Sequence, residues 1–190
     1  MIYSKESANA NSPDIRILYS GQIHQFSSGL IEPIARQCHS ILQRHPLDLN
    51  IFDPRENSLY LERLSLIRNE ISHSKTIRYL SLKILKENGW SLEDVYSDLV
   101  RFRCIPPNFQ EHPRARGLLC WHRDTFYANP ACQINLWVPL SSCDRSNGIV
   151  FFPEFLDSAV ENDSSSFSLD HWNQSGGFQA FRKEGDQVIA

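Results

Sequence analysis

The chain has 190 residues, of which 41% are hydrophobic, 11% aromatic and 22% charged, and its formal net charge is −3. This length and composition are those of one globular domain with its own hydrophobic core. The charge balance argues against nucleic acid as a partner, and no apolar segment is long enough to predict a membrane span. The five cysteines form no C-x-x-C pair and the polar N-terminus predicts no signal peptide, so we expect reduced thiols and a cytoplasmic location.

The first half of the chain has the periodicity of helices. Residues 1–12 are polar and are expected to be loose, whereas residues 16–22 predict a short strand. Apolar residues then recur at helical spacing in three segments, 30–44, 58–71 and 74–89. Ser91 and Asp94 fit a capping box, which predicts a helical turn. Residues 1–97 are therefore expected to form a mostly helical covering region.

From about residue 98 the spacing changes to that of strands. In the string VRFRC the arginines would lie on one face and the apolar residues on the other. Further apolar or alternating runs occupy residues 117–124, 132–140 and 148–153, and residues 157–177 are typical of a long loop. Helices followed by strands predict an α+β fold, in which the helices cover one side of an antiparallel β structure. We expect one domain over residues 1–190, with its β core in residues 98–190.

A His-x-Asp pair, His122 and Asp124, falls in the first of these alternating runs. On a strand, residues two apart share a face, so the imidazole and the carboxylate can aim at one point. Such a pair can form two corners of the 2-His-1-carboxylate facial triad that holds non-haem Fe(II). The alternative is a surface strand on which His122 and Asp124 pair with each other or with water.

The sequence around this pair resembles the Fe(II)- and 2-oxoglutarate-dependent oxygenases of the phytanoyl-CoA dioxygenase type. Three strings carry the resemblance: HRDTFYANPACQINLWVPL (122–140), SNGIVFFP (146–153) and FSLDHWNQSGG (167–177). The resemblance covers residues 17–180 and is specific in residues 121–155. It implies a double-stranded β-helix, the cupin-like jelly roll, with N-terminal covering helices.

The resemblance also implies roles for individual residues. His122 and Asp124 would be iron ligands, and Trp137 would lie beside the 2-oxoglutarate. Gln133 and Asn135 share a strand face with Trp137, so they could hydrogen-bond co-substrate or substrate inside the barrel. The residues between them, Ile134, Leu136 and Val138, would then pack against the helices. The alternative is an ordinary half-buried sheet on which Gln133 and Asn135 face water.

A facial triad needs a second histidine, which the family takes from a late strand, followed by an arginine that grips 2-oxoglutarate. His171, with Arg182 beyond it, has the right order but lies in a polar stretch that predicts a solvated loop histidine. The string EGDQVIA (184–190) fits the opening of that late strand better. On this interpretation the chain would stop before the distal histidine, and the C-terminal strands would be missing.

The function that the resemblance implies is an oxygenase that couples oxidative decarboxylation of 2-oxoglutarate by O₂ at Fe(II) to hydroxylation of a small molecule. Two alternatives stay open. The chain could be a catalytically inactive or truncated oxygenase-like remnant or interaction domain, or a cupin-like binding or isomerase domain that uses a different metal.

Overall fold

The computed structural model of the chain describes residues 2–4, 23–47, 58–93, 95–105, 122–162 and 164–174. The contacts divide the chain into two compact units. The first comprises Met1–Cys104 and Cys132–Val150, and the second Ile105–Ala131 and Phe151–Ala190. That the two units belong to a single domain stays a prediction.

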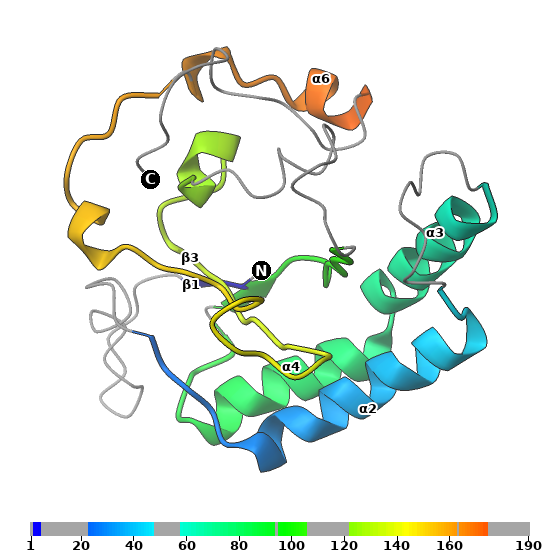
Figure 1. The fold of residues 1–190 in the computed structure, drawn as a ribbon. Helices are drawn as coiled ribbons and strands as arrows, with labels where there is room; N and C mark the ends of the chain where they lie inside the picture. The colour runs from blue at the N-terminus through cyan, green and yellow to red at the C-terminus, as the bar shows by residue number, and fades with distance from the viewer. Residues whose placement is uncertain are drawn as a thin grey trace. The chain divides into compact units, whose positions relative to one another are not determined.

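The helices of the first unit confirm the helical periodicity of the sequence. Within the described ranges they are α2 (Ser28–Arg44), α3 (Ser58–Ser72) and α4 (Lys75–Glu87) (Figure 1). Helix α4 begins at Ser74, whose side-chain oxygen accepts the backbone N–H of Ile77 at 3.2 Å and so satisfies one of the unpaired donors of the first turn. It ends before Gly89, which has a φ of 85° that suits a residue without a Cβ.

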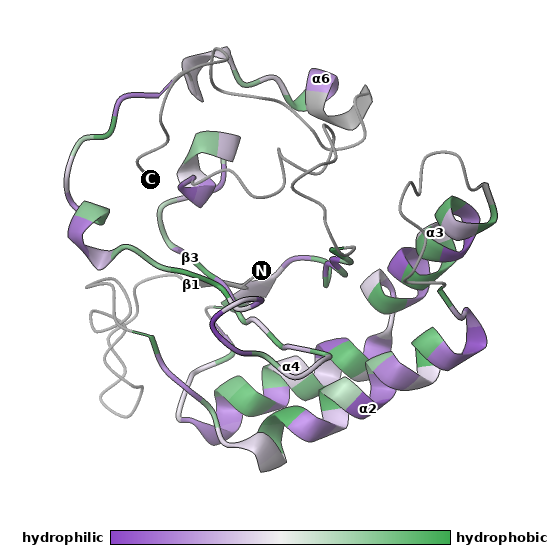
Figure 2. Ribbon diagram, in the orientation of Figure 1, coloured by the Kyte–Doolittle hydropathy of each residue, from purple (hydrophilic) through white to green (hydrophobic). Residues whose placement is uncertain are grey.

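The core of the first unit is an apolar cluster contributed by all of these helices. Figure 2 shows apolar and polar residues alternating around α2 and α4, as expected for helices with one buried face. The cluster consists of Ile34, Cys38, Ile41, Ile67, Ile71, Ile77 and Ile84. Fully burying one such side chain stabilises the fold by about 1.5–3 kcal/mol. This cluster is therefore the main source of stability that the described residues show.

Two extended segments lie on the same cluster. Val100 and Phe102 pack against it from one segment, and Val138 and Leu140 from the other. Burial alternates along the first segment, in which Arg101 and Arg103 are exposed. The predicted two-faced pattern is thus confirmed, although within the described residues 98–105 the backbone forms no strand.

A small sheet completes the described part of the first unit. Strand β1 (Ile2–Ser4) lies between β2 (Val95–Ser97) and β3 (Gln133–Ile134), and both pairings are antiparallel. Ile2 pairs with Ser97 on one side and Ile134 on the other. The expectation that residues 1–12 are loose is therefore wrong for the central strand, because pairing partners far along the chain order a segment with little local signal.

After Ser91 a single turn forms, in which the Val95 N–H donates to the Leu92 carbonyl at 3.4 Å, and no helix follows it in the described residues. The Ser91 hydroxyl accepts the N–H of Glu93 at 3.4 Å, but the chain then enters strand β2 at Val95 instead of a helix. Asp94, the other half of the predicted capping box, lies outside the described residues. A hydroxyl can cap an isolated turn as well as a helix, and the aromatic and β-branched residues that follow favour a strand.

A tight turn forms at residues 144–148, around the Ser-Asn-Gly that opens the string SNGIVFFP. Asp144 accepts hydrogen bonds from the N–H and hydroxyl of Ser146 at 2.7 and 2.6 Å, and these bonds hold the pKa of the Asp144 carboxyl below its usual value. The backbone N–H of Gly148 donates to the Asp144 carbonyl at 3.0 Å, and a Cβ at Gly148 would meet that oxygen at 3.0 Å. Asn147 closes the loop by donating to the carbonyl of Ser142 at 3.0 Å.

In its described part the second unit consists of short turns. They are the 3-10 helices η3 (Asp124–Tyr127), η4 (Pro153–Phe155) and η5 (Ser164–Ser166), and the helix α6 (Leu169–Gln174). The long loop predicted over 157–177 therefore contains two helical turns, and the strand predicted at 148–153 is not formed in the described residues. The double-stranded β-helix stays a prediction. No helix in the described ranges combines the length and the apolar character that a membrane span requires.

We predict that Ile67→Ala lowers the free energy of unfolding by about 2–5 kcal/mol, because Ile67 is fully buried and its truncation leaves a cavity in the helical core. Urea denaturation followed by the helical circular dichroism signal measures this loss. The control is Leu66→Ala, at a side chain that is 43% exposed on the same helix, with an expected cost below about 1 kcal/mol. Equal losses in the two variants would contradict the proposed core.

A shared carboxylate joins the end of α2 to α3. Glu70 contacts Arg44 through one oxygen and His45 through the other, each at 2.5 Å, and both contacts lower the pKa of the Glu70 carboxyl from its ordinary value of 4.5, the hydrogen bond from His45 most strongly. Arg63 adds a hydrogen bond to the carbonyl of Pro46 at 2.7 Å. The chain that leaves α2 is therefore fastened to α3 by charged groups.

We predict that Glu70→Gln removes an acid-dependent part of the stability. A carboxyl whose pKa is lowered in the folded state stabilises it fully above its unfolded pKa, and this stabilisation is lost as the pH falls through the folded pKa. Urea midpoints measured from pH 7 down to about pH 3 should therefore fall more steeply for the wild type than for Glu70→Gln. Glu62→Gln, at an exposed glutamate of the same helix, should keep the wild-type slope.

Candidate functional site

The His-x-Asp pair lies in the second unit, and its two side chains approach each other. Arg123 between them is extended, with φ −98° and ψ 142°, which turns the neighbouring side chains to the same side. The His122 Nε2 and Asp124 Oδ1 atoms are 3.6 Å apart, and the side chains are 27% and 38% exposed. The predicted convergence of the two groups is therefore present, and their role as metal ligands stays a prediction.

The strand predicted through this pair is not formed in the described residues 122–124, and the rest of it lies outside the described residues. Asp124 is the first residue of η3, which ends at Ala128 in the left-handed conformation with a φ of 57°. The side-chain N–H of Asn129 donates to the backbone carbonyl of Asp124 at 2.8 Å and fastens the two ends of this turn. Alternation of apolar and polar residues did not reveal the turn, because a tight turn followed by Asn-Pro depends on local hydrogen bonds.

The distance between the two groups can be compared with that in a metal site. Two ligand atoms at about 2.1 Å from one ion lie about 3.0 Å apart at a right angle and about 3.4 Å apart at the tetrahedral angle. The 3.6 Å between His122 Nε2 and Asp124 Oδ1 is slightly wider than either value, and a small rotation of a side chain would close the difference. The pair thus fits two adjacent ligand positions. The same distance also satisfies a simple histidine–aspartate ion pair.

A third ligand is not found next to this pair in the described part of the chain. No group of three His, Cys, Asp or Glu side chains that could hold a metal occurs there. His171 lies on α6 with an exposed side chain, and its backbone N–H donates to the Ser168 hydroxyl at 3.2 Å. Arg182 and the segment 184–190 lie outside the described residues.

The sequence analysis missed two aromatic residues, of which Tyr127 lies beside His122 and Phe167 contacts Tyr127. The rings of His122 and Tyr127 meet edge to face, with centroids 5.1 Å apart and an angle of 82°. Tyr127 in turn meets Phe167 at 5.9 Å and 89°. The spacing of Tyr127 three residues after Asp124 is a usable signal once a 3-10 helix is assumed, since residues three apart share one side of it. The sequence carries no comparable signal for Phe167.

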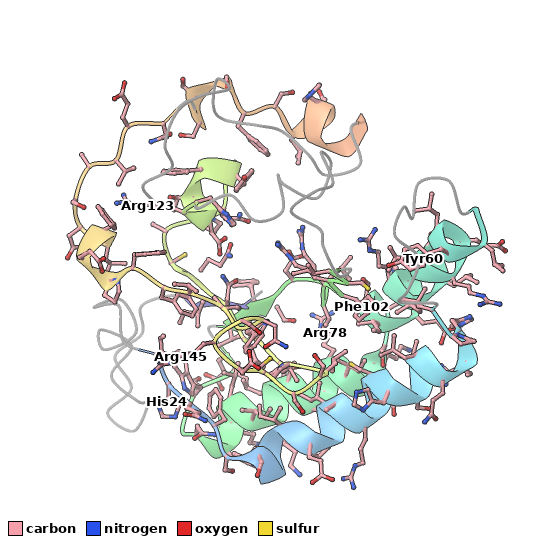
Figure 3. All side chains as sticks on the ribbon, in the orientation of Figure 1. His24, Tyr60, Arg78, Phe102, Arg123 and Arg145 are labelled. Carbon is pink, nitrogen blue, oxygen red and sulfur yellow. The ribbon has the colours of Figure 1, made fainter. Side chains whose placement is uncertain are left out.

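Arg123, which lies between the two residues of the pair, binds a turn that is distant in the sequence. Its guanidinium donates to the backbone carbonyls of Phe155 and Ser158. Figure 3 labels the Arg123 side chain. These bonds join the residue between His122 and Asp124 to the segment that contains η4. A planar guanidinium can serve two carbonyls at once, which a lysine ammonium does with less geometric control.

The predicted co-substrate residues lie in the first unit. The Gln133 side-chain amide donates to Asn135 Oδ1 at 2.9 Å, so these two side chains lie on one face, as the alternation predicts. Trp137 is 48% exposed, and Val138 next to it packs on the helical core. The part of the prediction that concerns Val138 is confirmed, and Ile134 and Leu136 are half-buried. Whether the polar face lines a barrel stays a prediction.

Comparison of the chain with protein-family models, with curated proteins and with solved structures gave no match.

We predict that Arg123→Ala loosens the turn around η4. The N–H groups of Phe155 and Leu156 bond within this turn, and Arg123 holds its carbonyl side. Hydrogen exchange followed by mass spectrometry should show exchange about tenfold faster in residues 153–158, since hydrogen bonds to a charged group contribute about 1.5–3 kcal/mol. Arg145→Ala, at an exposed arginine of the first unit, is the control. Unchanged exchange in Arg123→Ala would show that the turn forms without the guanidinium.

Proposed function

We propose that the chain is a non-haem Fe(II)/2-oxoglutarate-dependent oxygenase that acts on a small molecule, with His122 and Asp124 as two of the iron ligands. The observation that supports this most directly is the 3.6 Å approach of His122 Nε2 to Asp124 Oδ1. The string HRDTFYANPACQINLWVPL resembles the oxygenases of the phytanoyl-CoA dioxygenase type. This resemblance is the reason for proposing iron as the metal and 2-oxoglutarate as the co-substrate.

In this proposal each residue has a defined task. His122 would hold the ion through Nε2 and Asp124 through its carboxylate, and Fe(II), when bound, would supply the chemistry that activates O₂. The roles of Gln133, Asn135 and Trp137 rest on the resemblance alone: the two amides would supply N–H groups to the co-substrate, and the Trp137 ring an apolar surface. Arg123 stays outside the site and holds the backbone that carries both ligands.

A second candidate is an oxygenase-like remnant or a cupin-like domain that binds a different metal. The 3.6 Å between His122 Nε2 and Asp124 Oδ1 favours it, because this distance suits a histidine–aspartate ion pair that holds no iron, and because zinc also accepts these two ligand types.

Anaerobic titration of the full chain with Fe(II) and 2-oxoglutarate tests the proposal. A complete chelate should give a weak visible charge-transfer band, because the ion keeps adjacent open positions for the co-substrate. His122→Ala and Asp124→Ala should abolish the band. His24→Ala, at an exposed histidine of the first unit (Figure 3), should keep it.

The outcomes separate the candidates. Zinc or manganese that copurifies stoichiometrically, and is lost in His122→Ala, would contradict the iron oxygenase and favour the domain with a different metal. Absence of any metal binding that depends on His122 would contradict the iron oxygenase and the domain with a different metal, and would leave the inactive remnant.

A further inference from the structure

We propose that Tyr127 is a positioning residue for the His122 imidazole and that Phe167 holds Tyr127 in place. This inference rests on the proposed metal site and extends it to two residues that are not ligands. It also makes the turn η5, far along the chain from His122, a part of the site.

The contact between the rings of His122 and Tyr127 is the first step. At 5.1 Å and 82° the two rings adopt the edge-to-face arrangement that aromatic pairs prefer, with the positive edge of one ring on the negative face of the other. Rotation of the imidazole about its Cβ–Cγ bond would lose this contact. Tyr127 therefore favours the ring orientation that directs Nε2 toward Asp124.

The position of Tyr127 follows from the turn that also carries Asp124. Both residues belong to η3, which has about three residues per turn, so their side chains lie on the same side. The hydrogen bond from Asn129 to the Asp124 carbonyl, at 2.8 Å, fixes the end of this turn. The carboxylate and the ring that orients the imidazole are consequently carried by one small rigid piece of backbone.

Phe167 supplies the support behind Tyr127. Its backbone N–H donates to the Ser164 carbonyl at 3.0 Å and closes the η5 turn, and its ring meets the Tyr127 ring at 5.9 Å and 89°. Both aromatic side chains are half-buried. A row of three rings thus runs from the His122 imidazole to η5, and each ring restrains the next.

An edge-to-face ring contact of this kind changes an equilibrium by about two- to tenfold. Tyr127→Leu and Phe167→Leu, which keep an apolar side chain, should therefore weaken Fe(II) binding to the full chain by about three- to tenfold. Tyr127→Phe keeps the ring and should stay within about twofold of the wild type. Tyr79→Leu, at a tyrosine that is 65% exposed on α4, should have no effect.

Two readouts go beyond activity and stability. In metal-free protein, nuclear magnetic resonance of the His122 ring should show a shifted Cε1–H resonance in Tyr127→Leu and a smaller shift in Tyr127→Phe, because an adjacent aromatic ring shields that proton. With Co(II) as a probe ion, the visible absorption bands should change in Tyr127→Leu and Phe167→Leu but not in Tyr127→Phe. Phe167→Leu decides the matter if Tyr127→Leu does not fold.

The outcomes distinguish the inference from the function on which it rests. If the wild type binds Fe(II) through His122 while Tyr127→Leu and Phe167→Leu bind it equally well, the positioning role is overturned and the metal site stands. If the wild type binds no metal, the proposed function and the positioning role fail together. Weakened binding in both leucine variants, with rescue by Tyr127→Phe, supports the inference.

Discussion

Apolar packing between the helices α2, α3 and α4 is the constraint on which the first unit depends. Seven side chains, most of them isoleucines, form the shared cluster, and the segments around Phe102 and Val138 are extended on its surface. Each of those segments keeps one buried and one exposed face without the backbone hydrogen bonds of a sheet. This is possible because the helices cover the buried face. The described part of the second unit works differently. All fully buried hydrophobic side chains among the described residues belong to the first unit, and Arg123 and the ring row through Tyr127 join the turns of the second.

The contrast explains which elements the sequence predicts well. Helical spacing is a local signal, so α2, α3 and α4 were expected within a few residues of their observed bounds. Alternation from Val100 to Cys104 is local as well. The strand at Ile2–Ser4 was missed because its order comes from Ser97 and Ile134, which no window around residue 2 contains. The 3-10 turn at Asp124 was missed because alternating residues suit a strand until a hydrogen bond closes a turn.

The candidate site shows the same difference between features that follow from local spacing and contacts between segments distant in the sequence. The convergence of His122 and Asp124 follows from a spacing of two residues, and the shared face of Gln133 and Asn135 follows in the same way. The carbonyl partners of Arg123 and the contact between Tyr127 and Phe167 join segments that lie far apart in the sequence, so spacing could not predict them. The sequence therefore predicts which side chains of the candidate site face the same way. It does not predict the contacts that hold them in place.

The turn at residues 144–148 shows how much a shared Asn-Gly sequence can say about common ancestry. Every hydrogen bond described for it joins residues between Ser142 and Gly148, so its geometry is autonomous and needs no particular architecture around it. Unrelated proteins can arrive at the same short string for this reason alone. Shared Asn-Gly letters therefore say little about common ancestry, whereas an arginine that reaches two remote carbonyls, as Arg123 does, would be a far more discriminating mark of kinship.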